Sequence, residues 1–239
     1  MKINKERFDE WAQSIWGDRE AYSPSRLAKV AGISKSSLFF QRSKDYVEAN
    51  VVLSLSRGLQ LDPLSELMKF SEFDFLSEVR EPTEHELLSQ VSPENLLEAI
   101  LARLQHRDID QIELGTMPEP YGLKRWLDTT NMYGKYEDLA KQLDLSNISV
   151  LSKKINDNRL DLGQLARLSL FGGLNGRFAM VVSGNLTWSE AGFSWNAREK
   201  VLRDAPGMVL VESLWAARKW LDKAVQVKEL ERGVFKNFG

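Results

Sequence analysis

The side chains between residues 24 and 44 combine positive charge with short polar groups, which suits them to phosphates and to the polar edges of bases. This stretch contains five basic residues and no acidic residue. Lysine and arginine attract phosphate oxygens, whereas hydroxyl and amide groups hydrogen-bond to base edges. The basic residues are Arg26, Lys29, Lys35, Arg42 and Lys44, and the polar ones include Ser36, Ser37 and Gln41. A polyanionic partner is the first expectation, and a solvated surface is the simpler alternative for any single lysine.

Two short helices must position these side chains. Leu27 and Ala28 belong to a first helix that is expected to end at Gly32, and a second helix follows directly. Gly32 can adopt the left-handed backbone conformation that a tight turn between helices needs. Ile33 and Leu38 are apolar and can fill the space between the helices. The pattern predicts a helix-turn-helix, whose second helix fits the major groove of DNA.

A weaker copy of this arrangement recurs later in the chain. Leu27-Ala28-Lys29 returns as Leu139-Ala140-Lys141, and the pattern Leu-Ser-Leu-x-x-Gly-Leu at 53–59 returns at 168–174. The offsets are 112 and 115, so the second copy contains three extra residues between the two landmarks. Short leucine patterns recur in any helical protein, which leaves chance as the alternative. We favour an internal duplication because both matches occur in the same order.

Most of the remaining chain has the apolar spacing of helices. Tyr46 to Leu59 is expected to form an apolar helix, and Ser23-Pro24 and Asp62-Pro63 are typical helix starts. Phe178 to Val182 is a short β-like run before a turn, so a hairpin is expected there. A final helix is expected from Val209 to Glu231, where apolar residues alternate at spacings of four and three. That stripe indicates either intramolecular packing or a dimer seam.

The net charge of −2 hides an uneven distribution. Residues 62–119 contain fourteen acidic and four basic residues, a net charge of −10, so the remaining residues carry +8. An acidic stretch is either a solvated face or a sign of charge segregation. In both cases, two basic regions are separated by an acidic one.

These patterns predict a mainly α fold with two helix-turn-helix domains, a helical linker between them and a small mixed C-terminal extension. The expected boundaries are 1–78 for the N-terminal DNA-binding domain, 79–120 for the acidic linker, 121–176 for the second helix-turn-helix-like domain and 177–239 for a hairpin plus helix.

Motifs for catalysis are missing from the sequence. There is no cysteine, and His85-Glu86-Leu87-Leu88-Ser89 has serine where a zinc protease has its second ligand histidine. The glycine-rich segment 172–176 is not followed by the Gly-Lys-Ser/Thr of a phosphate-binding loop. We therefore expect no enzymatic activity, no metal and no cofactor.

The residues quoted above resemble those of a known family. Leu27-Ala28, Ala31-Gly32-Ile33-Ser34, Leu38 and the ending Gly58-x-x-x-Asp62-Pro63 resemble the lambda-repressor-like (Cro-type) helix-turn-helix family over residues 8–68. The second copy departs from the family at Asp144, where the turn glycine is expected, and Gln41 and Lys153 stand where an apolar residue is usual. The resemblance implies a DNA-binding transcription regulator, often a phage immunity repressor.

The resemblance also implies which side chains contact DNA, because exposed residues near the start of the second helix face base edges. In the first copy, the implied base contacts are Lys35, Ser36, Ser37, Gln41 and Arg42, and the phosphate contacts are Arg26, Lys29 and Lys44. In the second copy, the corresponding residues are Asn147, Ser149, Ser152, Lys153 and Lys154, with Arg159 near the backbone. Because the copies differ, one chain is expected to bind an asymmetric, bipartite double-stranded operator and repress transcription.

The alternative is a protein-interaction or dimerisation module with one degenerate helix-turn-helix, such as a regulator partner or an antitoxin-like protein. Four tryptophans lie in the C-terminal quarter, where they could form a core or an interface, including that of a homodimer: Trp188, Trp195, Trp215 and Trp220.

No run approaches the ~18 apolar residues of a membrane span. The charged segment from Met1 to Glu10 is unlike a signal peptide. We expect a cytoplasmic protein with no membrane partner.

Overall fold

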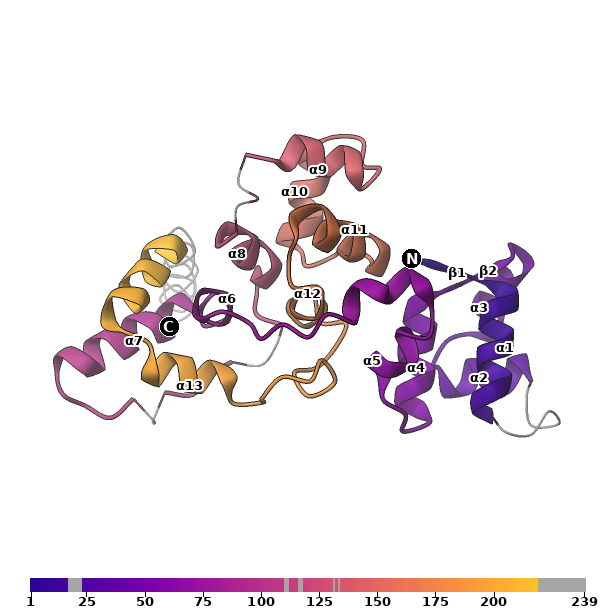
Figure 1. Cartoon of the computed structure of the whole chain (residues 1–239), viewed down its shortest axis with the longest axis horizontal. Helices are drawn as coiled ribbons and strands as arrows, with labels where there is room; N and C mark the ends of the chain where they lie inside the picture. Colours follow the sequence, from indigo (N-terminus) through magenta and orange to yellow (C-terminus); the bar gives the residue numbers. More distant parts are fainter. Residues whose placement is uncertain (17–22, 110–111, 116–117, 131, 133, 219–239) are drawn as a thin grey trace, which may run out of the picture.

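The computed structural model describes residues 1–16, 23–109, 112–115, 118–130, 132 and 134–218. Helices dominate these residues, which confirms the mainly α fold. The strands within the described ranges form one two-stranded antiparallel sheet. In Figure 1, the molecule has an N-terminal part at the right, a middle part, and a third part at the left that contains α7 (Pro93–Leu104) and α13 (Ala197–Asp204). The chain enters the third part at α6 (Glu84–Leu88) and α7, returns to the middle part, and comes back to the third part at α13. No helix in the described ranges is both long and apolar enough to cross a bilayer.

The N-terminal part contains the small sheet and five helices. Its elements are β1 (Lys2–Asn4), α1 (Lys5–Trp16), α2 (Pro24–Val30), α3 (Lys35–Ser43), β2 (Tyr46–Glu48), α4 (Ala49–Gly58) and α5 (Pro63–Leu67). The two predicted helix starts are confirmed. Ser23 Oγ accepts a hydrogen bond from the Arg26 amide at 3.3 Å, and Asp62 Oδ1 accepts one from the Leu64 amide at 3.0 Å. Side-chain caps therefore fix where α2 and α5 begin.

The helix expected from Tyr46 begins only at Ala49, so that expected boundary is wrong. Tyr46–Glu48 instead forms β2, in which Val47 lies opposite Ile3 of β1. Both of these side chains are fully buried. Pairing with the distant N-terminus decides the conformation of a segment whose apolar pattern fits either a strand or a helix.

The described secondary structure of the middle part consists of helices. It contains the 3₁₀ helix η1 (Ser71–Leu76) and the helices α8 (Gly122–Asp128), α9 (Tyr136–Gln142), α10 (Ile148–Asn156), α11 (Leu162–Gly172) and α12 (Gly176–Val182). Trp126 and Phe178 are fully buried and meet edge to face with ring centroids 5.7 Å apart. The N-terminal and middle parts share one hydrophobic core.

The hairpin expected at Phe178 to Val182 is wrong, because these residues form α12. Asn175 caps this helix, and its side-chain oxygen accepts a hydrogen bond from the Phe178 amide at 3.1 Å. All five residues from Phe178 to Val182 are buried. A short helix that is buried on every side shows no amphipathic period, so its sequence looks like that of a buried strand.

The third part combines segments that are far apart in the sequence. It contains α6 (Glu84–Leu88), α7 (Pro93–Leu104), α13 (Ala197–Asp204) and a helical segment at 207–218. These elements enclose a second hydrophobic core, separate from the first. Arg103 of α7 donates to the carbonyl oxygens of Leu202, Arg203 and Ala205. The segment 79–120, expected to act as a linker, thus packs against the C-terminal segment. Of the expected final helix, residues 219–231 lie outside the described ranges.

Ion pairs connect the N-terminal part to the middle part, among them Arg57–Glu190 and the pair between the Met1 amino group and Asp161. Arg57 of α4 contacts both carboxylate oxygens of Glu190, at 2.7 and 2.8 Å, and donates to Asn185 O at 2.7 Å. The hydrogen bond from Arg57 is the main cause that lowers the pKa of Glu190. The amino group of Met1 lies 3.4 Å from Asp161, which caps α11. These contacts, with the shared core, fix the two parts relative to each other.

Candidate nucleic-acid interface

The first candidate surface is built on α2, α3 and the turn between them, hereafter the first helical pair (residues 24–44). Gly32 has φ +66°, the left-handed conformation predicted from the sequence. The Ile33 amide donates to Ala28 O at 3.0 Å and closes the turn. Ser34 then caps α3, its Oγ accepting a hydrogen bond from the Ser37 amide at 3.0 Å. Leu38 is fully buried against the core and Ile33 packs against it. The backbone thus presents the start of α3 at the surface.

The second helical pair (residues 136–156) comprises α9, α10 and their turn, and it repeats this geometry. Asp144 has φ +53°, so it adopts the left-handed conformation of Gly32. The Leu145 amide donates to Ala140 O at 2.9 Å, the same closing bond as in the first pair. The Asp144 carboxylate is held by Arg167. Aspartate tolerates this conformation better than most residues, which explains how the turn exists without glycine.

The two turns differ in length by one residue. α3 is capped by Ser34, two residues after Gly32, whereas α10 is capped by Asn147, three residues after Asp144. Leu151, which is fully buried, therefore corresponds to Leu38. The sequence analysis placed Gln41 and Lys153 at equivalent positions, and that alignment is wrong by one residue.

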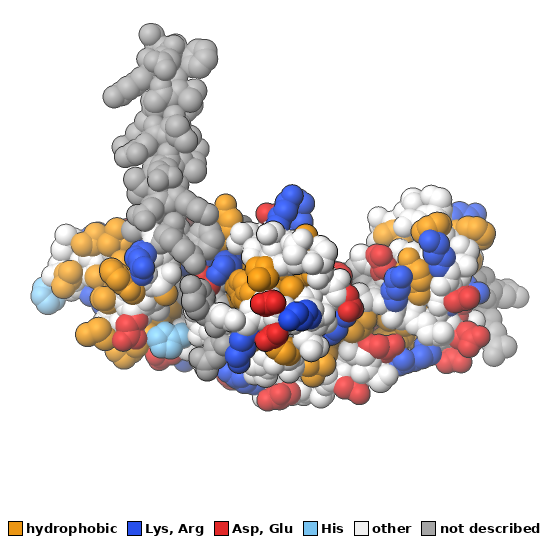
Figure 2. All heavy atoms as spheres, turned by 90° about the horizontal axis from the view of Figure 1, so that it is seen from above, with side chains coloured by type: hydrophobic (Ala, Val, Ile, Leu, Met, Phe, Trp, Pro, Cys, Tyr) orange, Lys and Arg blue, Asp and Glu red, His pale blue; other side chains and the backbone are white. Residues whose placement is uncertain are grey.

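Six of the eight candidate residues in the first helical pair are exposed. They are Arg26, Lys29, Lys35, Ser36, Ser37 and Lys44. The guanidinium of Arg26 lies over the Trp16 ring at 5.4 Å from its centroid, and Lys44 Nζ lies 4.3 Å from the centroid of Phe40. In Figure 2, Lys and Arg side chains lie beside hydrophobic ones on the N-terminal part at the right. This exposed cationic surface contains no acidic residue from its own segment.

Gln41 does not belong to this surface, which corrects its assignment as a base contact. Its side chain is 8% exposed, and Oε1 accepts a hydrogen bond from the Glu48 amide at 2.9 Å. The side chain therefore joins α3 to β2. A buried amide that satisfies a backbone donor is a structural group.

Arg42 is also occupied by a partner within the fold. Its guanidinium contacts both carboxylate oxygens of Asp9 in α1, at 2.8 and 2.9 Å. The two side chains are 17% and 20% exposed. A base contact by Arg42 would require this two-point ion pair to break, so its assignment as a base contact is corrected to a link between α1 and α3.

Two aromatic residues on α3 were missed as surface residues in the sequence analysis. Phe39 is 71% exposed and Phe40 is 55% exposed, although neighbouring Leu38 is fully buried. The helical period carries the signal, because Leu38 and Gln41 define the inward face and positions 39 and 40 lie outside it. Apolar side chains on a recognition helix can contact the methyl group of thymine.

The candidate residues of the second helical pair are mostly accessible. Asn147, Ser149, Lys153 and Arg159 are exposed, whereas Ser152 and Lys154 are half-buried. Two of the six make contacts within the fold: Asn147 caps α10, and Lys154 donates to Gln164 Oε1 at 3.2 Å. Ile148 and Val150 add exposed apolar surface, 43% and 37% exposed, at the start of α10.

The described residues contain no group of three or more His, Asp or Glu side chains placed to hold a metal ion. Comparison of the chain with protein-family models, with curated proteins and with solved structures finds no match.

Proposed function

We propose that this chain is a sequence-specific double-stranded DNA-binding transcription regulator, with α3 as the recognition helix. The observation that carries the proposal is the exposed cationic surface around the capped start of α3, built from a segment (24–44) that contains no acidic residue. Lys35, Ser36 and Ser37 occupy the first turn of α3, the region that faces base edges in a helix-turn-helix. Arg26, Lys29 and Lys44 flank it as phosphate contacts.

The finer architecture is part of the same proposal. The first and second helical pairs are two helix-turn-helix units of the lambda-repressor-like kind, and both can contact one duplex. Their side chains differ, so the preferred operator is asymmetric and bipartite. The parts of the molecule that contain the two units are joined by Arg57–Glu190 and by a shared core, which supports a fixed spacing between the half-sites. Repression by blocking polymerase, in a phage immunity setting, rests on the family resemblance.

Selection of bound fragments from random duplex DNA tests this proposal. A true regulator enriches one sequence, and its affinity falls steeply as salt rises because phosphate binding releases counterions. The variant Lys35→Ala should weaken binding to the enriched sequence, whereas Lys200→Ala, an exposed lysine on α13, is the matched control. Binding that is weak, salt-insensitive and unaffected by Lys35→Ala would contradict the proposal.

A protein-interaction role is the second candidate, and the exposed apolar residues favour it. In the third part, Leu101 and Leu104 of α7 and Met208, Val211 and Trp215 of the 207–218 helix are 41–73% exposed. Such surface on the C-terminal segment suits a homodimer contact. Sedimentation of the full chain with Trp215→Ser would test it, since a dimer that uses this surface should dissociate.

A further inference from the structure

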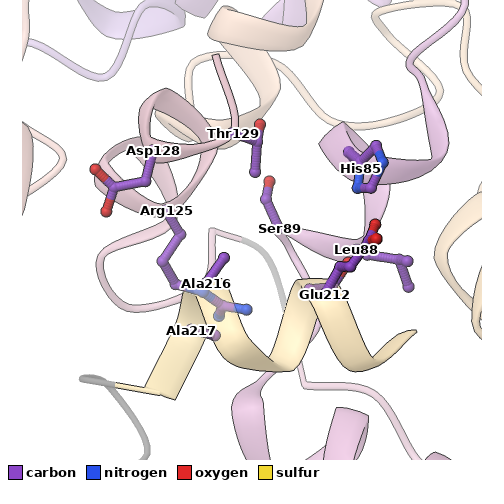
Figure 3. A pocket seen from close by; sticks show the side chains of 10 residues that line it. His85, Leu88, Ser89, Arg125, Asp128, Thr129, Glu212, Ala216 and Ala217 are labelled. Carbon is purple, nitrogen blue, oxygen red and sulfur yellow. The ribbon is translucent and has the colours of Figure 1, made fainter. Parts of the chain in front are cut away.

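A pocket of about 270 Å³ lies away from both helical pairs, between α6, α8 and the 207–218 helix. Figure 3 shows Arg125 reaching from α8 toward this last helix, while Glu212 lies on the other side of the pocket beside His85. Leu88, Ala216 and Ala217 give the pocket apolar wall. A single water needs only about 10–15 Å³ of such space, so the pocket is large enough for a small organic molecule.

Arg125 brings a buried positive charge to this pocket. Its side chain is 5% exposed, and its guanidinium donates to the carbonyl oxygen of Val91. Nε of Arg125 has no hydrogen-bond partner among the described residues. Burial lowers the pKa of Arg125 to about 10, so the group is still charged at neutral pH. Glu119, the acid with the largest electrostatic effect on it, is already paired with Arg198 at 3.4 Å.

A second polar group of the pocket is also left without a partner. Ser213 Oγ is buried and has no hydrogen-bond partner within the described ranges. Buried polar groups are almost always hydrogen-bonded, and Arg125 and Ser213 both line this pocket. Their unpaired atoms lie just beneath its wall, so a rotation of each side chain would bring it to an acceptor in the pocket. An anion accepts from both a guanidinium and a hydroxyl.

The acidic residues of the pocket limit which anion fits. Asp128 is engaged by Lys124, whereas Glu212 is exposed and makes no ion pair with the described residues. A free carboxylate would repel a purely anionic ligand but attract a ligand that also carries an ammonium group. The charges thus favour a zwitterion over a phosphate.

We propose that this pocket binds a small amino acid, with the ligand carboxylate at Arg125 and Ser213 and its ammonium group toward Glu212. The apolar wall of Leu88, Ala216 and Ala217 receives the ligand side chain. Because the ligand joins α8 of the middle part to the 207–218 helix, it stabilises their contact. The inference does not depend on DNA binding, and it is tested on the protein alone.

Thermal unfolding of the full chain with each standard amino acid is the first experiment. A ligand that binds only the folded state raises the unfolding midpoint. Calorimetric titration then compares the best amino acid with its two truncated analogues. For L-leucine these are 4-methylpentanoate, which lacks the amine, and 3-methylbutylamine, which lacks the carboxylate. We expect the intact amino acid to bind more tightly than either analogue, and inorganic phosphate not to compete.

Three variants connect the binding to this pocket. Ser213→Ala should weaken the affinity roughly tenfold, the value of one hydrogen bond to a charged group. The control is Ser169→Ala, because Ser169 Oγ is also buried with no hydrogen-bond partner in the described part of the chain but does not line the pocket. Glu212→Gln should weaken binding of the amino acid and leave binding of the plain carboxylate unchanged. Ala216→Phe changes an exposed residue and should abolish binding by filling the pocket, without loss of the fold.

The result that overturns the inference is an unchanged midpoint with every amino acid. Equal affinity of wild type, Ser213→Ala and Ala216→Phe for the best ligand would also overturn it, since binding would then occur elsewhere.

Discussion

The two helical pairs have the same turn and different surfaces. Each turn has one residue in the left-handed conformation and the same closing bond, from Ile33 to Ala28 and from Leu145 to Ala140. Residues 24–44 contain five basic and no acidic residues, whereas residues 136–156 contain three of each. The turn and the inward face are constrained by backbone geometry and packing, while solvated positions can change freely. The comparison therefore teaches that shared geometry does not imply a shared ligand.

Reversing the charge of lysines should weaken DNA binding much more in the first pair than in the second. This is the largest effect we expect. The double variant Lys29→Glu/Lys35→Glu should weaken DNA binding by at least about a hundredfold, with two contacts each worth about 1–3 kcal/mol. The slope of log affinity against log salt should fall by about two. Lys153→Glu in the second pair should have a smaller effect. A larger loss for Lys153→Glu than for the double variant would reverse our assignment of the main DNA-binding surface.

Ile155 and Arg42 occupy equivalent inward-facing positions in the two pairs. Truncating either side chain should lower the stability of the fold rather than the affinity for DNA. Ile155 is fully buried, so Ile155→Ala should cost about 2–5 kcal/mol of unfolding free energy. The corresponding Arg42→Ala should cost less, about 1–3 kcal/mol, through loss of the ion pair with Asp9.

Urea unfolding measures both changes, and Asp9→Asn should reproduce most of the Arg42→Ala effect. If Arg42→Ala left stability unchanged and abolished specific DNA binding, the role of Arg42 as a base contact would be restored.

The turn residues should respond unequally to substitution. Gly32→Ala should destabilise the first pair by about 1–2 kcal/mol, because alanine is strained at positive φ. Beyond its neighbours in the chain, no atom of the described residues lies within 4 Å of the added Cβ, so the cost is backbone strain alone. Asp144→Gly relieves the same strain but loses the contact with Arg167, so its net change should be small. Equal losses for both variants, measured by urea unfolding, would show that the turns are not equivalent.

The Arg57–Glu190 contact between the parts that contain the two pairs should give the smallest effect, a dependence of stability on pH. The pKa of Glu190 is lowered in the folded chain, chiefly by the hydrogen bond from Arg57. Its contribution to stability is therefore present above the ordinary glutamate pKa and is lost as pH falls through the lowered one. Arg57→Met should remove this part of the acid dependence of the unfolding midpoint. An identical pH profile for the variant would exclude the ion pair as its source.

Local signals in the sequence determined the starts of helices and the turns. Ser23-Pro24 and Asp62-Pro63 begin helices because their side chains satisfy nearby amides, and Gly32 adopts the conformation that suits glycine. The left-handed residue at 144 was also foreseeable, since aspartate tolerates positive φ. These features depend on neighbours a few residues away, so a sequence reveals them.

Tertiary contacts decided the rest. The strand at Tyr46–Glu48 exists because it pairs with residues at the start of the chain. Gln41 was separated from the exposed residues beside it by a hydrogen bond to β2 that no spacing rule predicts. The pocket at Arg125 forms where α6, α8 and the 207–218 helix meet. Burial and pairing between distant segments depend on how the whole chain packs, and the sequence alone does not record which segments become neighbours.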